Sequence, residues 1–193
     1  MPSFQCIVCR LDMLLSDVDG DKIFSAITNS FSSKNADVEH FLKNSAIQSM
    51  KLHQSSTYLV MSKDFDLLGY FTLALKVVRI DKSLLSNKET VKLQRFSLPD
   101  ANNNSFIMPA ILIAQVSKNF RKKTLSIKGC QLMDIVLSYV RSIQSQVGGL
   151  ITFLECEPVK KLVEFYKSQG FRFLSEKTIS KTDKELLQMY RLI

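Results

Sequence analysis

Apolar runs long enough to span a membrane, internal repeats and low-complexity tracts are all missing from this chain of 193 residues. No stretch reaches the roughly 18 consecutive apolar residues that a membrane-spanning helix needs. The N-terminal segment "MPSFQCIVCRLDMLLSDVDGDK" has an apolar patch, but no basic segment precedes it and acidic residues follow at once. These absences predict a cytoplasmic protein without a membrane segment.

Metal-ligating side chains are also scarce, with four cysteines and two histidines. Cys6 and Cys9 form a CxxC, which suggests either a redox pair or half of a zinc site. A second CxxC is missing, and His40 and His53 lie in a different segment. Because the pair lies in the apolar run "FQCIVCRL", we favour buried cysteines that pack as small hydrophobic residues, and we expect no metal site.

The composition that is present is typical of a globular protein, with 46% hydrophobic and 23% charged residues. A chain of this length can bury a substantial core without disulfides, and it fits one domain. The net charge is +8, from 26 Lys+Arg and 18 Asp+Glu. This excess would attract a polyanion such as RNA or an anionic cofactor, but charge alone does not choose between them or require either.

The first half of the chain alternates strand-like and helix-like patterns. The segment "FQCIVCRLDMLL" is a candidate edge strand, and "STYLVMS" with "DLLGYFTLALKVVRI" predicts a hairpin. Two helices are predicted over "KIFSAITNSF" and "NADVEHFLKNSAIQSMKLHQ", the second with Asn35 or Asp37 as its N-terminal cap. Residues 81–105 are polar and contain a Pro-Asp turn, so we expect a long excursion there, a candidate substrate-side loop.

The second half repeats a strand–helix order. The segment "FIMPAILIAQVS" is a predicted buried strand, "KNFRKKTLSIK" a basic loop and "GCQLMDIVLSYVRSIQSQ" a helix. A second buried strand "GGLITFLECE" precedes the helix "PVKKLVEFYKSQ", which we expect to carry proline in its first turn and to end at Gly170. The segments "FRFLSE" and "ELLQMYRLI" supply two closing strands. This order predicts an α/β fold, a mixed sheet flanked by helices.

The glycine in "IKGCQL", Gly129, begins a helix directly after the basic loop. Unpaired amides and partial positive charge at a helix N-terminus favour phosphate, and glycine allows close approach of the backbone. Nearby cations add positive charge: Arg121, Lys122, Lys123 and Lys128. On this segment alone, however, an ordinary helix start is the favoured interpretation, because short motifs often match by chance.

The order of strand "GLITFLECE", helix "PVKKLVEFY" and "KSQGF", with a tyrosine four residues before Gly-Phe, resembles the GNAT superfamily of acetyl-CoA-dependent N-acetyltransferases. The resemblance runs from about residue 55 to the C-terminus. It implies a GNAT fold, in which two parallel strands, here "AILIAQVSK" and "LITFLEC", separate in a V-shaped splay around the pantetheine arm. It also implies one domain over residues 1–193, with residues 1–34 as an N-terminal extension and a cofactor-binding half from about 106 to 193.

The resemblance assigns the cofactor contacts. Backbone groups near Val116 and Lys118 would contact pantetheine. The pyrophosphate loop, Gln/Arg-x-x-Gly-x-Gly/Ala in the family, maps onto Ser126, Ile127, Lys128, Gly129, Cys130 and Gln131. Only the central glycine matches, since Ser126 replaces the long polar residue and Gln131 replaces the last small one. The departures put CoA affinity in question but leave the mechanism intact, because the donors are backbone amides.

The resemblance also assigns catalytic residues. Tyr166 matches the family tyrosine that assists the departing CoA thiolate, whereas its pattern alone favours an aromatic on the core face of a helix. Glu155 and Glu157 are candidate bases or water-positioning groups, and a solvated strand end is the alternative for both. Gln115 stands near the position where some relatives carry Glu, and an amide cannot act as a base at neutral pH.

The front half, from "NADVEHFL" to "LLGYFTLA", resembles the toxin branch of bacterial GNAT enzymes, whose members acetylate aminoacyl-tRNA. The matching residues are Asp37, Phe41, Leu42, Ala46, Thr57, Tyr58, Val60, Gly69, Tyr70, Thr72 and Leu73. We therefore expect direct acetyl transfer from acetyl-CoA to a primary amine, with aminoacyl-tRNA as a candidate acceptor and a homodimer as a candidate assembly. The alternative is a degenerate, non-catalytic GNAT domain that binds acyl-CoA or a partner protein.

Overall fold

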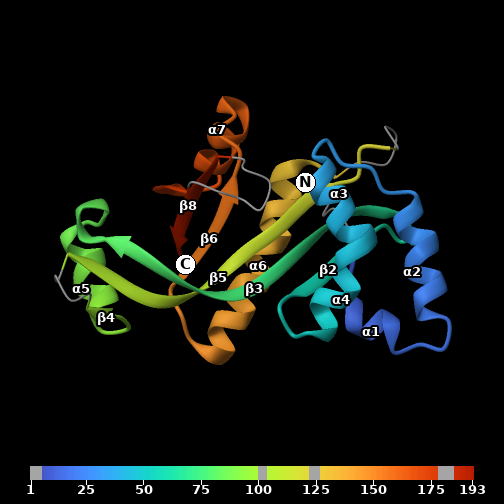
Figure 1. The fold of residues 1–193 in the computed structure, drawn as a ribbon, viewed down its shortest axis with the longest axis horizontal. Helices are drawn as coiled ribbons and strands as arrows, with labels where there is room; N and C mark the ends of the chain where they lie inside the picture. Colours follow the sequence, from blue (N-terminus) through green and yellow to red (C-terminus); the bar gives the residue numbers. More distant parts are fainter. Residues whose placement is uncertain (1–5, 100–103, 122–126, 178–184) are drawn as a thin grey trace. The chain divides into compact units, whose positions relative to one another are not determined.

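The computed structural model describes residues 6–99, 104–121, 127–177 and 185–193. The chain forms two compact units, the first from Met1–Ala74 and Ala114–Val136 and the second from Leu75–Ile113 and Leu137–Ile193. The strands of the described part form one mixed sheet in the order β1-β2-β3-β5-β6-β8-β7, with β4 paired to β5 (Figure 1). The predicted mixed sheet flanked by helices is confirmed.

The strands of the first unit are antiparallel. β1 (Ile7–Arg10) pairs with β2 (Ser56–Met61), and β2 pairs with the first part of β3 (Leu67–Asp81). β1 begins the strand order, so the predicted edge strand and hairpin are both present. The β2–β3 register shifts between Val60 and Met61, which leaves Leu68 as an extra residue on β3 and bends that strand.

The helices of the first unit supply one hydrophobic core. They are α1 (Leu11–Leu15), α2 (Gly20–Asn29), α3 (Ala36–His40), the π-helical turn η1 (Phe41–Ser45) and α4 (Ala46–Lys51). Leu11, Phe24 and Phe31 are buried in this core, so the first segments of the chain are packed against β2 and β3 rather than apart from them. The Asn35 side chain accepts from the amides of Asp37 and Val38, which confirms it as the cap of α3.

The second unit contains the parallel pair. β5 (Ser105–Lys118) and β6 (Ile151–Cys156) are parallel. Residues 111–113 of β5 pair with residues 152–154 of β6, and both strands continue past these pairs. β8 (Leu186–Leu192) lies antiparallel between β6 and β7 (Arg172–Lys177). The helices that follow β5 and β6 are α6 (Gly129–Val147) and α7 (Lys160–Ser168).

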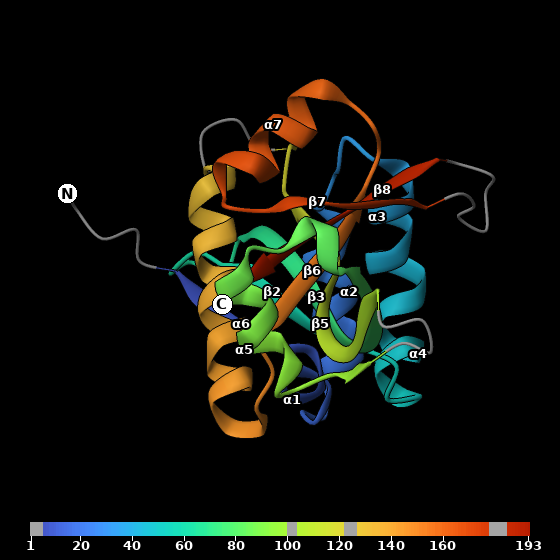
Figure 2. The same cartoon turned by 90° about the vertical axis from the view of Figure 1, so that its left-hand side faces the viewer.

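The excursion at residues 81–105 has secondary structure that its polar sequence did not reveal. It contains the 3-10 turn η2 (Lys82–Leu84), helix α5 (Asn87–Gln94; Figure 2) and the short strand β4 (Leu98–Pro99; Figure 1). A capping box begins α5, because Ser86 accepts from the Glu89 amide and the Glu89 carboxylate accepts from the Ser86 amide. The S-x-x-E spacing was the available signal for this helix.

Helix α7 begins later than its proline suggests. Its first residue is Lys160 and its cap is Val159, so Pro158 precedes the cap and the prediction of proline in the first turn is wrong. The end of the helix is as predicted. Gly170 has a φ of +80°, and the amides of Gly170 and Phe171 donate to Lys167 O and Tyr166 O.

Over the described residues, no helix is both long and apolar enough to cross a membrane.

Candidate functional site

The end of β5 carries the strand residues assigned to pantetheine. Val116 and Lys118 are both partly buried there, within the first unit. The backbone of β3 passes very close to them at Gly69, where an added Cβ would lie 2.8 Å from Ser117 O and 3.1 Å from Lys118 Cα. Glycine at position 69 is therefore required by packing against β5, which gives a physical reason for one position of the toxin-branch pattern.

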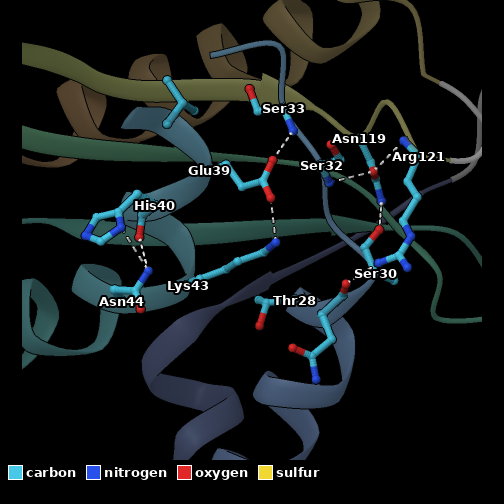
Figure 3. Close-up of polar contacts among 12 residues, drawn as sticks. Thr28, Ser30, Ser32, Ser33, Glu39, His40, Lys43, Asn44, Asn119 and Arg121 are labelled. Atoms are coloured by element: carbon cyan, nitrogen blue, oxygen red, sulfur yellow. Dashed lines mark hydrogen bonds and ion pairs between the residues drawn. The ribbon is translucent and has the colours of Figure 1, made fainter. Parts of the chain in front are cut away.

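Asn119, directly after β5, is a buried amide that connects three segments of the first unit (Figure 3). Its Oδ1 accepts from the amides of Ser32 (3.1 Å) and Arg121 (3.0 Å). Its Nδ2 donates to Ser30 O (3.0 Å) and Leu67 O (2.9 Å). Every hydrogen-bonding position of this side chain is thus used, and the exit of β5 is held in one conformation.

The start of α6 carries the residues assigned to the pyrophosphate loop. Lys128 O accepts from the Leu132 amide, which makes Lys128 the cap residue and Gly129, Cys130 and Gln131 the first turn. The Gln131 side chain turns back and accepts from the Lys128 amide at 2.9 Å. Gln131, which departs from the family pattern, therefore caps its own helix, while the amides of the first turn keep the orientation that favours an anion.

The other side chains at this helix start differ in exposure. Ile127 is buried, Gly129 and Gln131 are partly buried, and Lys128 and Cys130 are exposed. Ser126, the first residue of the assigned loop, lies outside the described residues, as do Lys122 and Lys123 of the basic loop.

Tyr166 is the buried aromatic of α7, in the second unit. Its side chain is 7% exposed, with its ring 5.3 Å from that of Phe165 and 6.0 Å from that of Phe171 between centroids. Burial raises the pKa of the Tyr166 phenol above its ordinary value, and the nearby Cys156 thiol raises it further. The phenol is therefore protonated at neutral pH and can donate a proton.

Glu155 lies on β6, also in the second unit. Its carboxylate accepts a hydrogen bond of 2.9 Å from Gln188 Nε2 on the neighbouring strand β8, and Gln188 Oε1 accepts from Ser175 of β7. These bonds fix the carboxylate on the sheet. Glu157 follows the strand, and its carbonyl accepts from the Val159 amide ahead of α7.

The predicted site residues thus fall into both units. Val116, Lys118 and residues 127–131 lie in the first unit, whereas Glu155 and Tyr166 lie in the second. Sequence reasoning missed Asn119, because its partners come from segments about 50 to 90 positions away along the chain. Its only local signal is a single polar residue between a strand and a run of basic residues.

Solved structures give the comparison with known proteins, since no family model and no curated protein matches the chain. A structure described as AtaT complexed with acetyl-methionyl-tRNAfMet is 19% identical, with a TM-score of 0.64, and covers 95% of this chain and 94% of its own. A tyrosine-to-phenylalanine mutant of KacT gives the same identity, TM-score and coverage. A mutant AtaT toxin bound to the C-terminus of the antitoxin AtaR and to acetyl-CoA is 16% identical, with a TM-score of 0.59. The match covers 97% of this chain and 93% of the AtaT chain.

These likenesses extend over nearly the whole length of both chains, at identities that establish the fold. They agree with the strand order and with the parallel β5–β6 pair. The protein therefore has the GNAT fold, in the form found in the toxin structures AtaT and KacT.

Proposed function

We propose that this protein is an N-acetyltransferase that moves the acetyl group of acetyl-CoA directly to a primary amine. The observation that carries the proposal is its GNAT fold, which is matched over nearly the full chain by a toxin structure that contains acetyl-CoA. The described residues support the proposal, since the first turn of α6 offers backbone amides for the phosphates and the Tyr166 phenol carries a proton for the leaving thiolate.

The cosubstrate would be held mainly by backbone groups. Val116 and Lys118 offer amides and carbonyls at the end of β5, and their position is fixed by Asn119 and by the close passage of Gly69. The pyrophosphate would accept hydrogen bonds from the first-turn amides of α6, at Gly129 and its neighbours Cys130 and Gln131. Lys128 is exposed and adds positive charge there.

The reaction needs a neutral amine, which attacks the thioester carbonyl carbon and forms a C–N bond. Collapse of the tetrahedral intermediate breaks the C–S bond and expels a thiolate. The Tyr166 phenol, which is protonated at neutral pH, would donate its proton to this sulfur. The proton lost by the amine would pass to water or to Glu155, whose carboxylate Gln188 orients.

Calorimetric titration with acetyl-CoA tests the first premise. We expect a single binding site, and a matched titration with CoA lacking the acetyl group should show that the nucleotide part supplies most of the affinity. An absence of heat at high micromolar acetyl-CoA would reject both the general acetyltransferase and the tRNA-directed enzyme. Binding without acetylation of any amine tested would instead support the non-catalytic alternative.

A second candidate function specifies the acceptor as the amino group of an aminoacyl-tRNA. It is favoured by the net charge of +8 and by the likeness to the structure of AtaT with acetyl-methionyl-tRNAfMet. Incubation of charged tRNA with radiolabelled acetyl-CoA distinguishes it. Label should appear on the aminoacyl group and be released with it by mild base, whereas deacylated tRNA should take up none.

A further inference from the structure

An aromatic ring with cations on either side of it in sequence lies immediately after β5, in the first unit. The Phe120 side chain is 36% exposed, although it is large and apolar. The Lys34 ammonium lies 5.0 Å from its ring centroid and the Lys118 ammonium lies 4.9 Å from it. Arg121 follows in the chain and is exposed. We name these four residues the Phe120 cluster.

The backbone under the Phe120 cluster is held by an extensive hydrogen-bond network. The Phe120 amide donates to Ser32 O at 2.9 Å, and the Asn119 amide donates to Leu68 O at 2.7 Å. The Asn119 side chain adds four further bonds, and the Arg121 guanidinium donates to Asn29 O (Figure 3). Because this backbone is already ordered, binding of a ligand to the Phe120 ring would cost little further conformational entropy.

Within the described residues, no ion pair neutralises the positive charge of the Phe120 cluster. Across the parts of the chain that the structure describes, ion pairs join Arg10, Lys22, Lys43, Lys160 and Arg172 to carboxylates, and none involves the cations of this cluster. The carboxylate of Glu39, in the helix that follows Lys34 in the chain, is engaged by Lys43 and by the Ser33 amide. The cluster therefore combines a partly exposed aromatic ring with positive charge that is available to an anion.

A partly exposed aromatic ring beside lysines matches the chemistry of an unpaired nucleotide. Base rings stack on aromatic side chains, and phosphates pair with lysine and arginine. An ammonium held over an exposed ring is bound weakly, so it can exchange the ring for a phosphate oxygen when a base takes its place. A double-stranded segment presents no free base and would use only the charges.

We propose that the Phe120 cluster binds an unpaired nucleotide of an RNA acceptor, with the base stacked on Phe120 and the adjacent phosphates on Lys34 and Lys118. The inference rests on the tRNA-directed form of the proposed function, which it deepens by assigning a contact site. Binding of RNA to the Phe120 cluster needs no acetyl-CoA, and so it can be tested separately from catalysis.

Fluorescence anisotropy with a labelled single-stranded RNA of about 12 nucleotides tests the site in the absence of acetyl-CoA. Phe120→Leu keeps an apolar side chain but removes the π-face, and we expect its dissociation constant to rise about tenfold. Phe120→Tyr should bind as the unchanged protein does. Phe96→Leu is the matched control, because Phe96 is another exposed phenylalanine, 58% exposed, in the second unit.

The lysines give an independent measurement. Lys34→Gln should weaken binding and reduce the slope of log K against log salt by about 0.7, the value for one phosphate contact on a single strand. Lys51→Gln, which removes an exposed charge at the end of α4, should leave the slope nearly unchanged. Thermal denaturation of each variant checks that the fold is retained.

Three results would overturn the inference. RNA binding by Phe120→Leu equal to that of the unchanged protein would mean that the ring only covers the lysine side chains. Loss of acetyl-CoA affinity in this variant, with RNA binding retained, would assign the ring to the nucleotide of the cosubstrate. An absence of RNA binding by the unchanged protein would reject the site, while acetyl-CoA binding in the same samples would leave the acetyltransferase proposal standing.

Discussion

Tyr166 has two candidate roles, packing of its ring in the core and proton donation by its hydroxyl, and removing the hydroxyl alone distinguishes them. The ring packs against Phe165 and Phe171, so Tyr166→Phe keeps the buried contacts and removes one oxygen. If the phenol protonates the thiolate, this change should lower kcat about 100-fold or more while the dissociation constant for acetyl-CoA stays nearly the same. Steady-state kinetics combined with calorimetry would measure both quantities.

A second buried tyrosine of the same unit provides the control. Tyr190 is fully buried, and its hydroxyl donates to Leu84 O at 3.1 Å. Tyr190→Phe should lower the free energy of unfolding by about 1 kcal/mol, because a carbonyl loses its donor, while kcat changes little. Equal losses of kcat in the two variants would indicate a general structural effect and remove Tyr166 from the mechanism.

Cys130 reports on the assigned pyrophosphate loop without any mutation. Its thiol is exposed in the first turn of α6, whereas Cys156 is buried and burial raises the pKa of that thiol to about 11. A thiol reagent at neutral pH should therefore modify Cys130 well before Cys156. Saturating acetyl-CoA should slow the modification of Cys130 several-fold, as peptide mass spectrometry over time would show.

The partly buried Cys9 on the edge strand β1 is the internal reference for this experiment. Its modification rate should not respond to acetyl-CoA. Equal protection of both thiols would indicate a global change in the protein, and no protection of Cys130 would place the pyrophosphate elsewhere.

At the scale of elements, an ion pair joins the excursion to the sheet of the second unit. Arg172 of β7 donates to the Glu89 carboxylate of α5 at 2.6 and 3.3 Å. This pairing lowers the pKa of Glu89 from 4.5 to about 2. Because the folded pKa is the lower one, the pair stabilises the fold above about pH 4.5, and the contribution is lost as the pH falls towards 2.

Glu89→Gln tests this linkage while preserving an acceptor for the Ser86 amide. At pH 7 the free energy of unfolding should fall by about 1 kcal/mol or less, since the Arg172 side chain is nearly half exposed and solvent screens the pair. The difference from the unchanged protein should shrink between pH 5 and pH 2 in thermal denaturation. Glu164→Gln, at an exposed pair with Lys160 of 4.0 Å, should show no such difference, and a pH-independent gap for Glu89→Gln would contradict the ion-pair account.

The elements also show what a single sequence can predict. Local patterns were sufficient for β2, β3, β5 and α6, because apolar periodicity and residue type determine where a segment is buried. They failed for α5, whose eight residues have little apolar character and depend on a cap and on Arg172, which lies far along the chain. They could not reveal Asn119 as a connector or Gln131 as a cap for the same reason, since a hydrogen bond is a property of the folded geometry.

For the whole molecule, the net charge of +8 and the GNAT fold bear on the same question, which is the identity of the acceptor. A basic protein attracts RNA without regard to sequence, so charge explains encounter rather than chemistry. Acetylation of aminoacyl-tRNA would remove aminoacylated initiator or elongator tRNA from translation. A cell that makes the active protein should then stop growing, whereas an enzyme for another amine has no such consequence.

Induced expression in a bacterial host is therefore the whole-molecule test. The unchanged protein should arrest growth and incorporation of labelled amino acids within about one generation, and Tyr166→Phe should relieve both effects because the transfer step is slowed. Tyr190→Phe, made to the same level, should still arrest growth if enough of it folds. Normal growth with abundant folded protein would reject aminoacyl-tRNA as the acceptor, and arrest by Tyr166→Phe equal to that of the unchanged protein would show that toxicity does not depend on acetyl transfer through this residue.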